Sequence, residues 1–239
     1  MTDLVPLAVL TGDLIGSSGL APERIEEAFA VLGSAAERIA AWQGHPTSLS
    51  RYRGDGWQIR LEQPGDCLWV CLLILARLHA DAAALGCRIA VGIGDGYTTD
   101  ASDLSTAMGP AFTASGRALD RMKQGELLAL DGVSPNRDNR QEDSESAVKY
   151  VKIDTFRKLA FTVAAELAGR WTTGQAEAMA LKLGPESPAD DRLSNEMIAR
   201  QLGITRQAVD ARLRSADYHI LDEMMLAFIA DYMPEGSIR

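Results

Sequence analysis

The stretch from Val5 to Leu20, VPLAVLTGDLIGSSGL, places the tightest constraint on what this chain can fold into. Its first half is an apolar run that predicts a buried strand over residues 7–10. The run ends in a turn that carries Asp13, and small residues lead from there into a helix expected to begin near Pro22. A carboxylate at the tip of a central strand can bind a divalent cation, and the N–H groups of such a turn can bind phosphates.

A second carboxylate, Asp55, lies between glycines in the segment RYRGDGWQIRL. The two flanking runs, residues 48–52 and 57–61, have strand-like composition, so the glycines predict a tight hairpin turn. A hairpin that places Asp55 beside Asp13 would form a two-carboxylate site for Mg²⁺ and a nucleotide. Either aspartate taken alone is as well explained by a turn or a helix cap.

Composition limits the protein classes to which the chain can belong. Its 239 residues allow one large domain or two modest ones, and the net charge of −9 argues against a protein that simply coats nucleic acid. A small DNA-reading module with clustered basic residues stays compatible with that charge. No apolar run reaches membrane-spanning length, no signal peptide is evident, and three cysteines do not suggest a disulfide framework. We therefore expect a cytoplasmic protein without a membrane partner.

The hydrophobic periodicity predicts the order strand, helix, strand, strand, helix, strand, helix, strand over the first 130 residues. This order indicates an α+β fold, a mostly antiparallel sheet with helices on one face. A polar, aperiodic stretch begins at residue 133 and precedes a connecting helix. The predicted division is a domain over residues 1–132, a linker and connecting helix over 133–170, and an all-α helix-turn-helix domain over 171–239.

The C-terminal region, SNEMIARQLGITRQAVDARLRSA, has the form of a helix-turn-helix. Gly203 permits the sharp turn, Ile204 fills the corner, and Thr205 caps the second helix. The residues expected to face DNA are Thr205, Arg206, Gln207, Arg212 and Arg214. Small helical domains also use this shape for protein contacts. The last helix, residues 218–232, is rich in apolar residues and could serve either dimerisation or core packing.

Residues 7–131 resemble the palm-type catalytic domain of class III adenylyl and guanylyl cyclases, which has a ferredoxin-like sheet. The resemblance rests on LTGDLIGSSGL, RYRGDGWQI, RIAVGIGDGYTT and GPAFTASGRAL. It implies that Asp13, Asp55 and the carbonyl of Leu14 bind two cations, Mg²⁺ or Mn²⁺. It also implies that Gly16 and Ser17 contact the triphosphate.

In the helical segment GPAFTASGRAL, Arg117 aligns with the arginine that stabilises the transition state in the cyclase family. Thr113 stands where the family has a catalytic asparagine. The lysine that reads the base falls near Arg51, and the aspartate that reads adenine falls at Thr106. The base-selective residues are therefore not those of an adenylyl cyclase.

The whole chain is similar to the SatD family of bacterial proteins. That similarity rests on the GD motif after the first strand, the central GD motif, the GPAF…R helix, and the final WT-x-x-Q…IA-x-x-LG-I-[ST] module. It implies a nucleotide- and metal-binding cyclase-like domain joined to a helix-turn-helix, most simply a transcriptional regulator. Such a protein would bind a nucleoside triphosphate and double-stranded DNA, and it would form a homodimer.

Two other functions stay open at this point. The chain could be an active nucleotidyl cyclase or nucleotidyltransferase that uses a two-metal mechanism. It could also be a degenerate cyclase fold that serves as a dimerisation scaffold.

Overall fold

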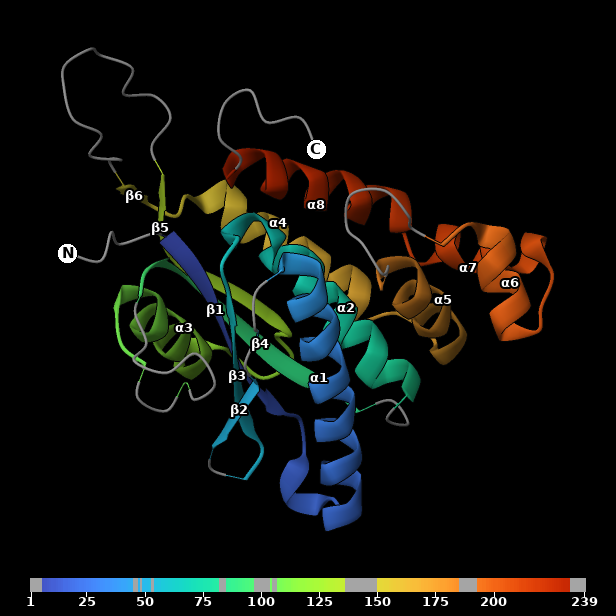
Figure 1. Ribbon diagram of the computed structural model, residues 1–239, viewed down its shortest axis with the longest axis horizontal. Coiled ribbons are helices and arrows are strands. Elements are labelled where there is room, and N and C mark those ends of the chain that lie inside the picture. The colour runs from blue at the N-terminus through green and yellow to red at the C-terminus, as the bar shows by residue number, and fades with distance from the viewer. Residues whose placement is uncertain are drawn as a thin grey trace.

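The computed structural model describes residues 6–44, 47, 49–52, 54–81, 85–96, 104, 107–135, 150–184 and 193–232 (Figure 1). Its strands are β1 (Pro6–Leu14), β2 (Leu49–Tyr52), β3 (Gly56–Leu61), β4 (Cys87–Asp95), β5 (Leu128–Pro135) and β6 (Tyr150–Lys152). Its α-helices are α1 (Pro22–Gln43), α2 (Cys67–Asp81), α3 (Pro110–Arg121), α4 (Thr155–Ala168), α5 (Thr173–Leu183), α6 (Asn195–Leu202), α7 (Arg206–Ser215) and α8 (Tyr218–Tyr232). Two short 3₁₀ helices, η1 (Ser17–Gly19) and η2 (Pro64–Asp66), precede α1 and α2.

The six strands form one sheet in the order β2-β3-β1-β4-β5-β6. The neighbours among β1 to β4 are antiparallel, and β5 lies parallel to β4. The first four strands with α1 and α2 therefore make a β-α-β-β-α-β unit of the ferredoxin-like type. The predicted α+β class and the predicted element order are confirmed.

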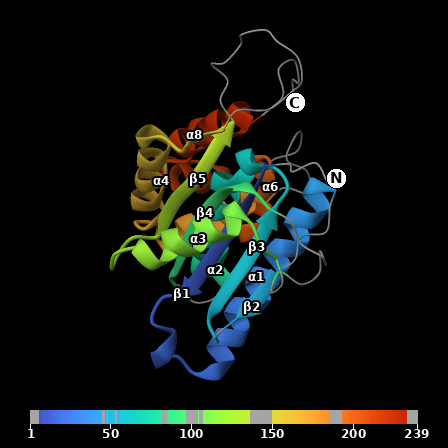
Figure 2. The same cartoon turned by 90° about the vertical axis from the view of Figure 1, so that its left-hand side faces the viewer.

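Helices cover both faces of this sheet, so the prediction of helices on one face is wrong. Alternate residues of β1 point to opposite faces, and Ala8 and Leu10 belong to the main core with α1 and α2. Leu7 and Val9 instead pack against Ala111 of α3 on the other face. Figure 2 shows α3 on the face of the sheet turned away from α1 and α2.

A glycine in β4 explains how α3 approaches this second face so closely. A Cβ added to Gly92 would lie 2.1 Å from the carbonyl oxygen of Ala111 and 2.4 Å from the backbone nitrogen of Ser115. Only a residue without a side chain leaves room for the helix at that point. Gly92 is therefore required by the packing of α3 on β4.

The main core continues from the sheet into the C-terminal helices. Helix α2 is buried over most of its length, and α5 packs along it. Trp69 Nε1 donates to the carbonyl of Leu183 at 2.7 Å, and Trp171 Nε1 donates to the carbonyl of Ala216 at 3.1 Å. One hydrophobic cluster includes residues from β1 through α8. The predicted boundaries at residues 132 and 170 stay predictions, although β5 itself runs on to Pro135.

Helices α6 and α7 form where the sequence predicts two short helices. Ser194 Oγ accepts from the N–H of Met197, and Thr205 Oγ1 accepts from the N–H of Ala208, so both helices have side-chain caps. Gly203 has a φ of 65°, which is the left-handed conformation that ends α6. None of the helices within the described ranges is long and apolar enough to span a membrane.

Candidate functional site

The two predicted carboxylates lie at one end of the central strands. In the register of the sheet, Asp13 pairs with Gly56 of β3 on one side and with Arg88 of β4 on the other. Asp55 immediately precedes Gly56, in the turn between β2 and β3. The predicted hairpin therefore exists and brings Asp55 to the same end of the sheet as Asp13.

Short polar contacts hold each carboxylate in place. Arg88 Nε donates to Asp13 Oδ1 at 2.9 Å, and Arg88 Nη2 donates to Asp13 Oδ2, so the guanidinium and the carboxylate form a bidentate pair. Ser17 Oγ donates to Asp55 Oδ2. The loop that carries Ser17 turns through Gly16, whose φ of 73° is left-handed.

Arg88 is the central cation of this cluster. The hydrogen bond to Asp13 raises the pKa of the Arg88 guanidinium, although burial opposes that rise, and the negative charge of Asp55 contributes in the same direction as Asp13. One guanidinium thus sits in the field of both carboxylates. Arg88 was not among the site residues predicted from the sequence. A charged residue inside an apolar strand was the available signal, but its partner depends on the β1–β4 register.

A polar stripe runs from the carboxylates across the same face of the sheet. Thr11 lies two residues before Asp13 and therefore shares its face. Gln58 Nε2 donates to Thr11 Oγ1 at 3.1 Å, and the hydroxyls of Thr11 and Ser115 are 2.8 Å apart. This stripe connects β3, β1 and α3 through hydroxyl and amide groups.

A cavity of about 500 Å³ adjoins the stripe. It is lined by Ser50, Arg51, Tyr52, Gln58, Leu104, Ala107 and Phe112. Ser50 pairs with Gln58, and Gln58 pairs with Thr11. The side chains of Ser50 and Gln58 therefore lie on the face of the sheet that carries Asp13. Two residues along a strand span about 7 Å. A ligand with an anionic end at the carboxylates and Arg88 could therefore place a flat ring in this cavity.

The guanidinium of Arg51 faces away from this site. It lies 3.9 Å above the ring of Phe29, donates to Glu26 Oε1 at 2.7 Å, and donates to the carbonyl of Gly54 at 2.8 Å. These partners belong mainly to α1, which covers the other face of the sheet. The structure therefore does not bring the Arg51 side chain to the face of Asp13. Thr106 lies outside the described residues.

Thr113 and Arg117 lie on the outer side of α3. The sheet-facing residues of this helix are Ala111, Ser115 and Ala118, which are buried. Thr113 and Arg117 are exposed and lie about 200° around the helix from Ala111 and Ser115. Within one chain they point away from Asp13. They could complete a site only in another copy of the chain.

The donor set at the strand ends fits a hard divalent cation. Two carboxylates and a backbone carbonyl supply oxygen ligands, and Mg²⁺ in nucleotide sites commonly uses one or two carboxylates with phosphate and water. The side chain of Leu14 is buried, so only its carbonyl could contribute. Among the residues that the structure describes, no cluster of three or more His, Cys, Asp or Glu side chains could hold a metal by itself. Water or a phosphate-bearing ligand would complete the coordination of a cation here.

The basic residues predicted to face DNA differ in their environment. Arg206 and Arg214 of α7 are exposed, as are Thr205 and Gln207. Arg212 instead donates to Glu177 Oε2 at 2.9 Å and to the carbonyl of Gly174 at 3.1 Å. Arg212 thus joins α7 to α5, and the exposed face of α7 carries Arg206, Gln207 and Arg214.

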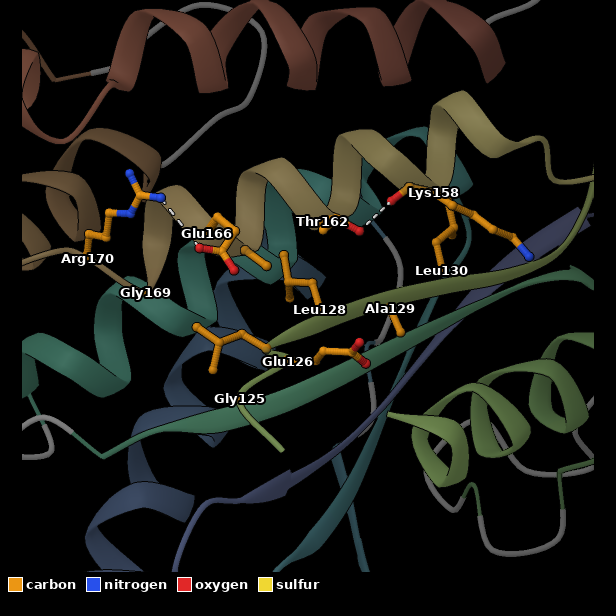
Figure 3. A pocket seen from close by; sticks show the side chains of 12 residues that line it. Gly125, Glu126, Leu128, Ala129, Leu130, Lys158, Thr162, Glu166, Gly169 and Arg170 are labelled. Atoms are coloured by element: carbon orange, nitrogen blue, oxygen red, sulfur yellow. Dashed lines mark hydrogen bonds and ion pairs between the residues drawn. The ribbon is translucent and has the colours of Figure 1, made fainter. Parts of the chain in front are cut away.

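A second cavity, of about 450 Å³, lies away from the carboxylates, between β5 and α4 (Figure 3). Leu128 and Leu130 contribute to it from β5, whereas Lys158, Thr162 and Glu166 contribute from α4. Lys158 Nζ donates to Asp131 Oδ1 at 3.2 Å. Neither Asp13 nor Asp55 lines this cavity, so it is separate from the candidate site.

The chain is similar to several solved structures. No protein-family model matches the sequence, and no curated protein matches it. The guanylate cyclase domain of RhGC from Catenaria anguillulae in complex with GTP is 16% identical with a TM-score of 0.41, over 54% of this chain and 79% of that one. The guanylyl cyclase Cya2 is 18% identical with a TM-score of 0.36, over 63% and 90%. The adenylyl cyclase CyaB from P. aeruginosa is 13% identical with a TM-score of 0.37, over 64% and 96%.

Proposed function

We propose that the chain binds a nucleoside triphosphate with Mg²⁺ or Mn²⁺ at the Asp13–Asp55–Arg88 end of the sheet. We propose further that it is a homodimeric transcriptional regulator of the SatD type, which binds double-stranded DNA through α7. The observation that carries the nucleotide proposal is the meeting of two carboxylates and one guanidinium beside a cavity on one face. The proposal places the protein in the cytoplasm, where both ligands occur.

Each residue of the site has a stated part in binding. Asp13 and Asp55 would hold the cation, which when bound would neutralise phosphate charge. The cation would compete with Arg88 for Asp13, and a displaced Arg88 would be able to contact a phosphate oxygen. Gly16 and Ser17 would line the phosphates. Gln58 and Ser50 would offer hydrogen bonds to the base. Arg51, which the resemblance placed near the base, points toward Glu26 and Phe29 and is not oriented for this role.

Regulation is favoured over turnover because the Asp13 carboxylate is already paired with Arg88, and because a catalytic set would need Thr113 and Arg117 from a second copy. Thr113 and Arg117 face outward from α3, and Asp13 is bound on both oxygens by Arg88. An active nucleotidyl cyclase or nucleotidyltransferase is the second candidate. The exposure of Arg117 favours it, because an exposed arginine on one subunit could enter the site of another.

The nucleotide proposal is tested by calorimetric titration of the full chain with ATP, GTP, CTP and UTP, in Mg²⁺ or Mn²⁺. We expect at least one triphosphate to bind, and Asp13→Asn and Asp55→Asn to weaken binding by about tenfold or more. Asp120→Asn, which changes an exposed carboxylate of α3, is the matched control. Mass spectrometry of the same mixtures separates the two candidates, since a cyclic or linked product lost in Asp13→Asn would establish the enzyme.

The DNA proposal needs a separate measurement. In a gel shift with genomic fragments, we expect a salt-sensitive complex that Arg206→Ala and Arg214→Ala weaken. Arg200→Ala on α6 is the control, because Arg200 is exposed and pairs with Glu196 on a helix not expected to enter the groove. Absence of any shift, with every nucleotide and without nucleotide, would contradict DNA binding and leave the nucleotide site standing.

A further inference from the structure

Helix α4 carries an apolar stripe on its outward side. Phe156 is 83% exposed, Leu159 54% and Val163 40%. The spacing i, i+3, i+7 puts these three side chains on one face of the helix. Leu167, one turn further on, is partly buried and continues the stripe. Four large apolar side chains thus follow one another along a surface helix.

The opposite face of α4 is already occupied by the core. Phe161, Ala164, Ala165 and Ala168 are buried there. A helix that is apolar on two opposite faces satisfies only one of them by packing within the chain. The remaining stripe is therefore the kind of exposed patch that marks an interaction surface.

The neighbouring helix α8 packs on the buried side of α4, not on the stripe. Figures 1 and 2 show α4 and α8 side by side at the margin of the molecule. Arg157 Nε donates to Asp231 Oδ2 at 2.9 Å, and the rings of Phe161 and Phe228 are 5.2 Å apart. Helix α8 thus covers the side of α4 that carries Phe161, and the side that carries Phe156, Leu159 and Val163 stays exposed.

We propose that this α4 stripe is a dimerisation surface and that its occupant is a second copy of the chain. The chain's own segments outside the described ranges are poor candidates, since residues 136–149 read NRDNRQEDSESAVK and residues 233–239 read MPEGSIR. Neither contains a run of apolar residues that matches the three exposed ones. The stripe itself is self-complementary.

An antiparallel pairing of two α4 helices satisfies the stripe with a two-fold axis at Val163. It sets Leu159 opposite Leu167 of the partner subunit. It also sets Phe156 opposite Arg170 of the partner subunit, whose side chain is 72% exposed. A guanidinium over an aromatic ring is attractive, and two antiparallel helices oppose their dipoles favourably. Charge and shape therefore both fit a second copy.

Analytical ultracentrifugation of the full chain tests this surface. We expect a dimer at about 50 µM protein and a dissociation constant at least about tenfold higher for Val163→Asp, because two carboxylates would meet at the axis. Met108→Ser removes an apolar side chain that is more exposed (57%) than Val163 from another surface, and it should leave the constant unchanged. Circular dichroism of each variant shows that the fold is retained.

Cysteine cross-linking gives a second readout that does not depend on loss of binding. The three native cysteines are buried, and burial raises their thiol pKa values, so they react poorly. Val163→Cys should form an interchain disulfide on mild oxidation, whereas Arg200→Cys on α6 should not. A wild-type chain that stays monomeric at 50 µM, or a dimer indifferent to Val163→Asp and uncross-linked by Val163→Cys, would overturn the proposal. The surface rests on the homodimer of the proposed function: a monomeric chain would contradict both, a dimer indifferent to the Val163 variants would contradict the surface alone, and neither result would bear on nucleotide binding.

Discussion

Asp13 can be neutralised by the Arg88 guanidinium or by a divalent cation, and both use the same carboxylate oxygens. Arg88 is about one-third exposed, so the pair is partly screened by solvent. Replacement of the guanidinium by an apolar side chain of similar length removes the competitor for a cation. It also removes a donor that a phosphate would need. Loss of the guanidinium should thus raise the affinity of the site for a divalent cation and lower its affinity for a triphosphate.

We therefore predict that Arg88→Met raises the affinity for Mn²⁺ alone by a few-fold and lowers the affinity for a triphosphate with Mn²⁺ by about tenfold. Titration followed by Mn²⁺ electron paramagnetic resonance measures the first, and calorimetry measures the second. Arg121→Met, which breaks the ion pair of Arg121 with Asp131 on β5, is the matched control. Parallel changes in both affinities would show that Arg88 only maintains the fold.

Gly92 and Gly116 provide a second test at single residues. A Cβ on Gly92 would meet the backbone of α3 at 2.1 Å, whereas a Cβ on Gly116 would meet nothing within 4 Å. We expect Gly92→Ala to lower the free energy of unfolding by about 2 kcal/mol or more through overpacking. Gly116→Ala should raise it by about 0.5–1 kcal/mol, since alanine favours the helix. Urea unfolding measures both changes, and equal effects would contradict the packing of α3 on β4.

The parts of the candidate site that depend on local sequence were predictable, and the contacts between residues far apart in the chain were not. The glycines around Asp55 indicate the hairpin, and the apolar run before Asp13 indicates the strand end. Arg88 lies 75 residues from Asp13, and their pairing depends on the β1–β4 register. A shift of one residue would turn Arg88 to the other face. The orientation of Arg51 toward Phe29 likewise follows from which face of β2 carries it.

At the scale of elements, Asp131 links β5 to helices on both faces of the sheet. It accepts from Arg121 of α3 and, at 3.2 Å, from Lys158 of α4. Burial alone would raise the pKa of Asp131, but the N–H of Gly132, Arg121 and Lys158 together lower it. A carboxyl group whose pKa is lowered on folding stabilises the fold above its unfolded pKa, near pH 4. That contribution is lost as the pH falls through the lower folded pKa.

We accordingly expect Asp131→Asn to cost about 1 kcal/mol at pH 7 and much less at pH 3. Urea unfolding at the two pH values measures this difference. Asp120→Asn, an exposed carboxylate one residue before Arg121, controls for the general loss of negative charge. A cost of Asp131→Asn that stays the same at pH 3 would show that the ion pairs contribute nothing.

The elements themselves were largely predictable, and their faces were not. Periodicity finds α3, but both sides of β1 are apolar and buried, as in Leu7 to Leu10. A continuous apolar run is typical of a strand covered on both faces, so the signal was present, but it does not reveal which helices form each layer. The extension of β5 to Pro135 was missed because its last residues, Gly132 to Pro135, have turn-forming composition.

At the scale of the whole molecule, α2 joins the sheet to the C-terminal helices. It is apolar on nearly every side, and α1 and α4 cover only part of its surface. Helix α5 packs along it, Trp69 donates to the carbonyl of Leu183, and Arg38 donates to the carbonyl of Gly184 at 2.9 Å. Helix α8 packs so closely on η2 that a Cβ on Gly65 would lie 2.9 Å from Ile229 Cα. Direct packing therefore connects the sheet and its helices to α5 and α8.

This packing predicts that the chain does not divide at the boundary that composition suggests. A chain that ends at Arg170 would expose the side of α2 that α5 covers, including Trp69, which is 2% exposed in the full chain. Exposed apolar surface of this kind promotes association, so we expect the shortened chain to aggregate, or to lose its cooperative unfolding transition. Sedimentation and thermal unfolding measure the outcome, and a chain that ends at Tyr232 is the control for shortening. A soluble, cooperatively folding chain over residues 1–170 would instead establish two independent domains, and any signal between nucleotide and DNA would then have to pass through the connecting helix α4.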